Sequence, residues 1–168
     1  TAMGTPIDAV IVDKPPGRVF PVRVLHLSDD WFGRAFDPLF EPEGFSNEND
    51  LARIIMSSGT TAVPKPIGHS VRVVEDRIQT GYRTLSLAKW DRMMCLPVLT
   101  SSLGFGSALQ ALSYGHTVVF AETALEALQM ISLYGVDLVV ANPQHLKSMV
   151  EAHKETPIPV PTLRLIKY

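Results

Sequence analysis

Residues 115–143, GHTVVFAETALEALQMISLYGVDLVVANP, contain a strand, a helix and a second strand in one short stretch. The apolar runs 117–120 and 137–140 are rich in valine and are typical of buried strands. Between them, Thr123 can cap a helix that ends at Gly135. Two such strands joined by a helix predict a parallel pair.

The same alternation continues on both sides of this stretch. Upstream, residues 92–96 are a strand candidate and residues 102–114 a helix candidate; downstream, a helix opens at Pro143 and residues 163–166 are the last strand candidate. Continuous apolar strands that alternate with helices imply a parallel sheet covered on both faces. We therefore predict an α/β fold, a Rossmann-like three-layer subdomain with a mainly parallel β-sheet.

The first part of the chain is less regular. Residues 9–12 and 22–25 are short strand candidates, and residues 28–49 are predicted to form an irregular connection. Order returns with an apolar strand candidate at 51–56, and apolar residues at helical spacing predict a helix over 70–88.

Composition excludes several classes of protein. Of the 168 residues, 46% are hydrophobic and 19% charged, and the net charge is -2 with no Lys/Arg run, which argues against a nucleic-acid partner. Every apolar run is far shorter than the ~20 residues of a membrane span. The single cysteine, Cys95, excludes an internal disulfide, favours a reducing compartment and predicts a cytoplasmic location; we expect it to be a core residue. The histidines lack metal-ligand spacing, so no metal site is predicted.

Both ends of the sequence indicate a piece of a longer protein. The chain starts at Thr1 and stops at Tyr168, within a run that resembles a strand. We therefore treat residues 1–168 as a single partial domain.

The segment with the clearest chemistry follows the strand candidate at 51–56. It consists of small and hydroxyl residues and ends in a lysine: Ser57, Ser58, Gly59, Thr60, Thr61, Ala62, Val63, Pro64 and Lys65. Backbone N–H groups and hydroxyls in such a loop can turn toward an anion, and Gly59 leaves room for a phosphate. Lys65 adds a positive charge for a phosphate tail.

Two other interpretations of this segment stand beside the phosphate loop. Loops of Ser, Thr and Gly are common turns that bind nothing. A P-loop NTPase needs G-x-x-x-x-G-K-[ST], but here Pro64 replaces the second glycine and Pro66 replaces the hydroxyl residue. The sequence therefore disfavours a P-loop NTPase.

Taken together, the run from Ser57 to Thr61 with Pro64-Lys65 resembles the phosphate-loop signature of the adenylate-forming superfamily, which includes acyl-CoA synthetases and luciferases. Residues 115–120, 136–143 and 162–166 resemble later stretches of that family, so the likeness covers about residues 50–168. It implies that the chain is part of the large N-terminal domain of such an enzyme, with the remaining N- and C-terminal parts as its partners.

The resemblance implies a function for the parent enzyme. An AMP-forming acyl-CoA synthetase would activate a carboxylic acid with Mg-ATP and pass the acyl group to a thiol such as coenzyme A. The phosphate contacts would come from six residues, and the segment alone should have no turnover. These residues are Ser57, Ser58, Gly59, Thr60, Thr61 and Lys65.

The resemblance also places Thr100 and Ser101 near the acid, at a point where the family often has a histidine. Three departures, Ala62, Pro66 and Thr100, keep an alternative open. In this alternative the chain is a degenerate, non-catalytic module of the same fold that binds a nucleotide or a partner.

Overall fold

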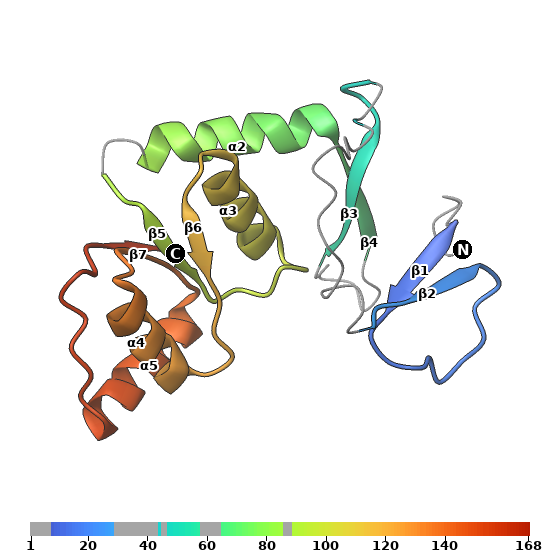
Figure 1. Cartoon of the computed structure of the whole chain (residues 1–168). Coiled ribbons are helices and arrows are strands. Elements are labelled where there is room, and N and C mark those ends of the chain that lie inside the picture. The colour runs from blue at the N-terminus through green and yellow to red at the C-terminus, as the bar shows by residue number, and fades with distance from the viewer. Residues whose placement is uncertain (1–7, 29–43, 45–46, 58–64, 86–88) are drawn as a thin grey trace. The chain divides into compact units, whose positions relative to one another are not determined.

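The computed structural model describes residues 8–28, 44, 47–57, 65–85 and 89–168 (Figure 1). The chain forms two compact units, residues 1–44 and 45–168, and each is described by itself. In the first unit, β1 (Ala9–Val12) pairs in parallel with β2 (Arg23–His26). Both strand predictions in this part are confirmed, whereas most of the predicted connection at 28–49 lies outside the described residues.

A four-stranded parallel sheet is the centre of the second unit. Its strand order is β6-β5-β7-β8, and every neighbouring pair is parallel. The prediction of an α/β fold with a mainly parallel sheet is confirmed. The strands are β5 (Arg92–Cys95), β6 (Thr117–Val119), β7 (Leu138–Val140) and β8 (Leu165–Lys167).

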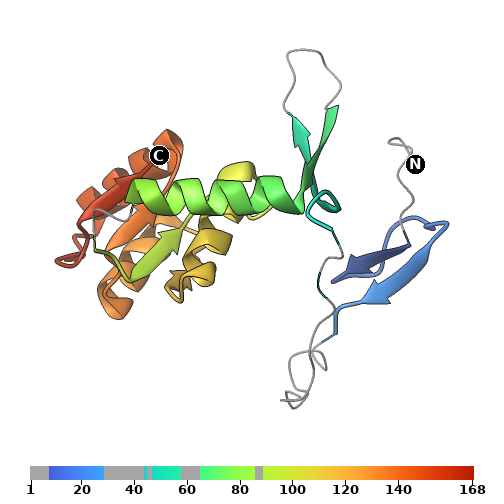
Figure 2. The same ribbon diagram turned by 90° about the horizontal axis from the view of Figure 1, so that it is seen from above.

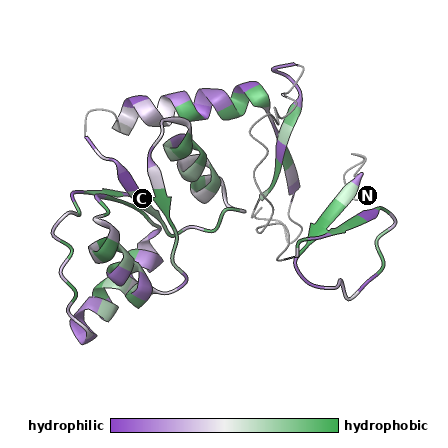
Figure 3. Ribbon diagram, in the orientation of Figure 1, coloured by the Kyte–Doolittle hydropathy of each residue, from purple (hydrophilic) through white to green (hydrophobic). Residues whose placement is uncertain are grey.

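Helices cover both faces of this sheet (Figures 1 and 2). On one side lies α3 (Ser102–Ser113), and on the other lie α4 (Ala124–Tyr134) and α5 (Pro143–Glu155). In Figure 3, α3 is largely green, as expected for a helix that packs on a sheet.

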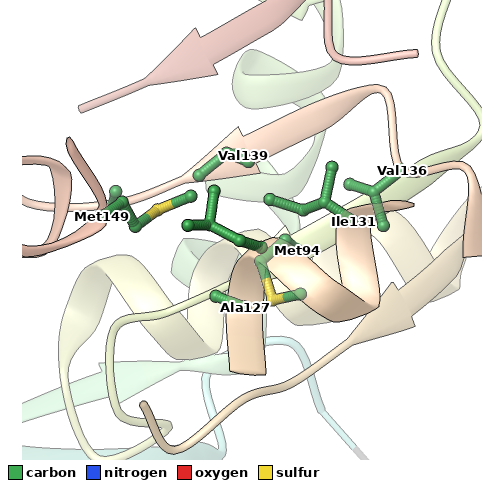
Figure 4. Close-up of a cluster of buried hydrophobic side chains, with 8 residues drawn as sticks. Met94, Ala127, Ile131, Val136, Val139 and Met149 are labelled. Carbon is green, nitrogen blue, oxygen red and sulfur yellow. The ribbon is translucent and has the colours of Figure 1, made fainter. Parts of the chain in front are cut away.

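Alternation along β5 divides the core into two clusters. Met94 points to the face of α4 and α5 and packs with Ile131 and Met149 (Figure 4), whereas Met93 and Cys95 point to the face of α3. All three side chains of 93–95 are buried, which confirms the prediction that Cys95 is a core residue.

The helix ends follow the signals in the sequence. The hydroxyl of Thr123 accepts a hydrogen bond from the N–H of Glu126, and Gly135 ends α4 with a φ of 63°. Asn142 and His145 form a capping box at the start of α5. These local caps explain why the boundaries in this part agree closely with the predictions.

Asp137 ties the amino-terminal ends of three strands together through its carboxylate and its backbone. Asp137, just before β7, accepts hydrogen bonds from the backbone N–H groups of Asp91 and Arg92 at 3.1 to 3.2 Å. Its backbone carbonyl accepts from the N–H groups of Arg164 and Leu165 at the start of β8. Burial removes water from this carboxylate, so its protein partners replace the lost solvation.

The segment around Lys65 differs from the sequence prediction. The chain forms an antiparallel hairpin of β3 (Leu51–Ser57) and β4 (Lys65–Ser70), followed by α2 (Val71–Leu85). The sequence analysis assigned a strand at 51–56 and a helix over 70–88 but no element between Lys65 and the helix, where the structure has a strand antiparallel to β3. Residues 65–70, KPIGHS, have low strand propensity, so their conformation depends on pairing with β3 rather than on local preference.

The part of the chain that the structure describes has no helix long and apolar enough to cross a membrane.

Candidate functional site

The hairpin brings the two ends of the predicted phosphate loop together. Ser57 and Lys65 are direct partners in the antiparallel register, and residues 58–64 connect them. Four of the six predicted phosphate residues, Ser58, Gly59, Thr60 and Thr61, lie outside the described residues. For this loop, the structure therefore defines the two anchor points and leaves the rest as a prediction.

Alternation places Lys65, Ile67 and His69 on one face of β4. His69 is opposite Arg53 of β3 in the register, and these two side chains share a small cavity at the start of α3. The side chain of Lys65 is exposed. One face of the hairpin thus carries several basic side chains.

Pro66 fits this hairpin without distortion. It is paired with Met56 in a sheet of only two strands, where each strand is an edge and a missing N–H can be tolerated. A proline at this position therefore holds β4 extended next to Lys65.

Arg53 connects the hairpin to the loop that follows β5. Its Nη2 atom donates to the backbone carbonyls of Leu99 and Thr100, both at 2.9 Å, and of Ser101 at 3.2 Å. The guanidinium lies 3.9 Å from the centre of the Phe105 ring, a cation–π contact. Burial, together with the nearby charge of Arg77, lowers the pKa of Arg53. Arg53 therefore fixes the position of residues 99–101 relative to β3.

Both residues predicted to bind the acid lie in this loop. Thr100 is exposed and, with Ser101, lines an open cavity of about 570 Å³ next to Arg53. The hydroxyl of Ser101 caps α3: it donates to the carbonyl of Val98 at 2.7 Å and accepts from the N–H of Gly104 at 3.0 Å. Ser101 thus shapes the loop through its cap, while the side chain of Thr100 faces open space.

The loop after β5 also occupies a special position in the sheet. The chain leaves β5 toward β6 on one side, and β7 lies on the other side of β5. Open α/β sheets bind ligands beyond the carboxyl ends of the strands at such a reversal of strand order. The topology therefore places residues 96–101 at the end of the sheet where such folds bind ligands, independently of the sequence motif.

A second cavity, of about 450 Å³, lies between α2, α3 and the end of β8. At its rim Arg77 donates to the hydroxyl of Ser102 at 2.7 Å. Inside, the ammonium of Lys167 donates to Ser107 at 3.2 Å and to the side-chain oxygen of Gln110 at 3.5 Å. Burial lowers the pKa of Lys167.

Burial raises the pKa of the Cys95 thiol to about 11, against a partly opposing effect of Lys167. The thiol is therefore protonated at neutral pH and is no nucleophile there. Within residues 8–28, 47–57, 65–85 and 89–168, no three His, Cys, Asp or Glu side chains are placed to hold a metal ion.

Residues 9–166 match the family described as AMP-binding enzyme. The match covers nearly the whole chain and includes both the hairpin and the parallel sheet. The chain belongs to the AMP-binding enzyme family. The resemblance drawn from residues 57–65 is thereby confirmed, and the family assignment extends to the first unit, which that resemblance did not reach.

Solved structures of adenylate-forming enzymes share this fold. O-succinylbenzoate coenzyme A synthetase (MenE) from Bacillus subtilis, in complex with AMP, is 23% identical with a TM-score of 0.69, over 87% of this chain and 37% of that chain. VinN in complex with L-aspartate is 18% identical with a TM-score of 0.74, over 94% and 42%. The luciferase-like enzyme from the nonluminescent Zophobas morio mealworm is 21% identical with a TM-score of 0.64, over 93% and 35%.

This member of the AMP-binding enzyme family spans less than half of each of these three chains. Among curated protein sequences, none matches it significantly. The likeness to these solved structures shows the fold of this chain.

Sequence reasoning missed Arg53, Arg77, Gln110 and Lys167. Arg53 sits in an apolar strand, where one cation among Ala52, Ile54 and Ile55 was the only available signal. Lys167 directly follows residues 163–166, to which we assigned only a strand. The partners of Arg53 and Lys167 are 46 to 60 residues away in the sequence, so the tertiary fold was needed to find them.

Proposed function

We propose that the protein carrying this chain is an AMP-forming acid–thiol ligase of the acyl-CoA synthetase type. A carboxylate oxygen of the acid attacks the α-phosphorus of ATP, and the bond between the α- and β-phosphates breaks. Pyrophosphate leaves with the bonding electron pair, and the acyl-adenylate remains. A thiol, for which coenzyme A is the proposed donor, then takes the acyl group and releases AMP.

The observation that carries this proposal is the family match over residues 9–166, combined with the hairpin that it includes. The register sets Ser57 opposite Lys65, so both ends of the loop at 58–64 are held by one pair of strands. In our proposal Lys65 and the loop hold the β- and γ-phosphates of ATP, where an exposed cation neutralises charge that shifts onto the departing pyrophosphate.

Arg53 gives the proposal a geometric basis beyond the loop itself. The phosphates would lie at the tip of the hairpin, and the acid would lie near Thr100. Because Arg53 holds residues 99–101 from β3, the two substrates would be positioned by a shared set of contacts. Positioning of two reactants can supply a large part of the rate enhancement.

Magnesium and coenzyme A are proposed from the family. Structures of MenE from Bacillus subtilis have been solved with ATP and magnesium ion and with a product analogue, OSB-NCoA. No carboxylate of this chain is assigned to the magnesium ion, which the phosphates of ATP would bring with them. Further proposals are that the segment alone has no turnover and that the protein is cytoplasmic; the buried, free Cys95 supports the second.

The test is acid-dependent exchange of pyrophosphate into ATP by the protein that carries this chain, with and without Lys65→Ala. We expect exchange in the parent and a loss of about 100-fold in kcat in the variant, the usual cost of removing one charge-stabilising group. The control is Lys154→Ala, at an exposed lysine on α5.

Ala62, Pro66 and Thr100 suggest the alternative of a non-catalytic module. The exchange assay combined with calorimetric titration with Mg-ATP separates the ligase from this alternative. Binding of Mg-ATP without exchange for any acid would favour the non-catalytic module, and absence of both would exclude a nucleotide function.

A further inference from the structure

The cavity between α2, α3 and the end of β8 has the size of a small-molecule site. Its volume of about 450 Å³ lies in the ordinary range for ligand pockets. It starts at Ser102, one residue after the loop that carries Thr100 and Ser101. Arg77 and Ser102 also line the small cavity beside Arg53, which in turn lines the cavity at that loop, so a ligand in the groove can extend toward the loop.

One side of α3 forms the wall of this cavity. Ser102, Gly106 and Gln110 are four residues apart, so they lie along one stripe of the helix. With 1.5 Å of rise per residue, the stripe is about 12 Å long. A Cβ at Gly106 would meet nothing within 4 Å, so the middle of the stripe is open. The cavity is thus an elongated groove along the helix.

The far end of the groove holds a cation without an anionic partner among the described residues. The ammonium of Lys167 donates only to neutral atoms, the hydroxyl of Ser107 and the side-chain oxygen of Gln110. The groove is lined by one carboxylate, Asp76, against two cations, Arg77 and Lys167. Cys95 faces Lys167 from the sheet, but its thiol is protonated at neutral pH.

Gln110 adds an unsatisfied donor at the same place. The side chain is 3% exposed, and its Nε2 atom has no hydrogen-bond partner. Gly81 of α2 leaves room for this amide, because a Cβ at position 81 would lie 2.5 Å from the side-chain oxygen of Gln110. A half-buried cation that lacks an anionic partner and a buried N–H that lacks an acceptor are costly, and one incoming carboxylate would satisfy both.

We propose that this groove binds the tail of the acid and selects acids with a second carboxylate, held by Lys167 and Gln110. The inference rests on the proposed function, with the reacting carboxylate at residues 99–101. Ser107 and Gln110 lie five and eight residues beyond Ser102, a distance of about 8 to 12 Å along the axis. A linear dicarboxylate of about six to eight carbons spans that distance.

The experiment compares matched acids. Adipate and suberate are titrated calorimetrically into the protein that carries this chain, in parallel with hexanoate and octanoate, and each acid is also used in the exchange assay. We expect Lys167→Met to weaken diacid binding at least tenfold and to raise the KM for diacids, while the monoacids bind as well or better. Lys167→Arg should retain most of the diacid affinity, and Lys154→Met is the control for loss of a surface lysine.

Gln110→Glu is the second variant. It is nearly isosteric and places a carboxylate beside Lys167, so it should also abolish the preference for diacids. A parent protein that binds hexanoate as tightly as adipate would overturn the inference. It would also be overturned if Lys167→Met and Gln110→Glu each weakened the binding of diacids and monoacids equally.

Binding is measured without ATP, so the two proposals fail separately. Diacid-selective binding without exchange would refute the ligase and support the groove. Exchange with monoacids and no diacid preference would refute only the groove. Diacid affinity should also fall as pH rises through the lowered pKa of Lys167, because the anion needs the protonated amine.

Discussion

The parallel sheet and the β3–β4 hairpin are held in place by different means. In β7 every side chain is buried, and β5 is buried from Met93 onward. In the hairpin, Leu51, Met56 and Ile67 are among the exposed large apolar residues. The sheet is fixed by apolar burial, whereas the hairpin depends on pairing, on α2 and on the hydrogen bonds of Arg53. The region with the proposed chemistry is thus the less buried one.

The largest effect is expected when the same substitution, methionine to alanine, is made in each of the two regions. Met94 is 0% exposed in the sheet, and Met56 is 57% exposed in the hairpin. We expect Met94→Ala to reduce the free energy of unfolding by about 3 kcal/mol, because it leaves a cavity between β5 and α4. Met56→Ala should cost less than about 1 kcal/mol. Denaturant titration of both variants gives the values.

The comparison fails if the two methionine variants lose similar stability. Such a result would mean that the hairpin contributes to the same core as the sheet.

A second test concerns the link between the two regions. Arg53→Met removes three hydrogen bonds and a cation–π contact, so we expect a loss of about 2 kcal/mol and a lower kcat for exchange. Arg53→Lys keeps the charge and can reach fewer carbonyls, so it should lose about half as much. Stability and exchange kinetics are measured on the same preparations.

The link would be unimportant for catalysis if Arg53→Met lost stability and kept the parent kcat. Recovery of kcat in Arg53→Lys would support a role in positioning.

The smallest expected effect is a pH dependence of the free energy of unfolding that arises from Cys95 in the sheet. The pKa of Cys95 is raised from 9.0 to about 11 in the fold, so the folded state keeps this proton at pH values where the unfolded state has lost it. The associated stability is present below pH 9 and is lost as pH rises toward 11. Between pH 9 and 10 we expect a loss of about 1 kcal/mol. The measurement is unfolding at each pH beside Cys95→Ala, and parallel pH profiles of the two proteins would contradict the assignment.

Much of the sheet was predictable because its signals are local. Valine-rich strands, the cap at Thr123 and the stop at Gly135 each act within a few residues. The family was likewise accessible, because residues 57–65 are contiguous in the sequence.

The hairpin and the groove were not predictable in the same way. Strand β4 contains Pro66 and Gly68, and it is stabilised by pairing with β3 rather than by its own preference. The three carbonyls that Arg53 contacts carry no side-chain signature at all. Lys167 and Gln110 are 57 residues apart, so only the packing of β8 against α3 brings them together.

The carboxylate of Asp137 has a consequence for how this fold can change in evolution. It closes the amino-terminal edge of the sheet by binding the start of β5, while the adjacent backbone binds the start of β8. That edge needs no contribution from residues 96–101 or from Lys167 at the opposite edge. We therefore expect Thr100 and Lys167 at the opposite end of the strands to accept substitutions with little loss of foldability.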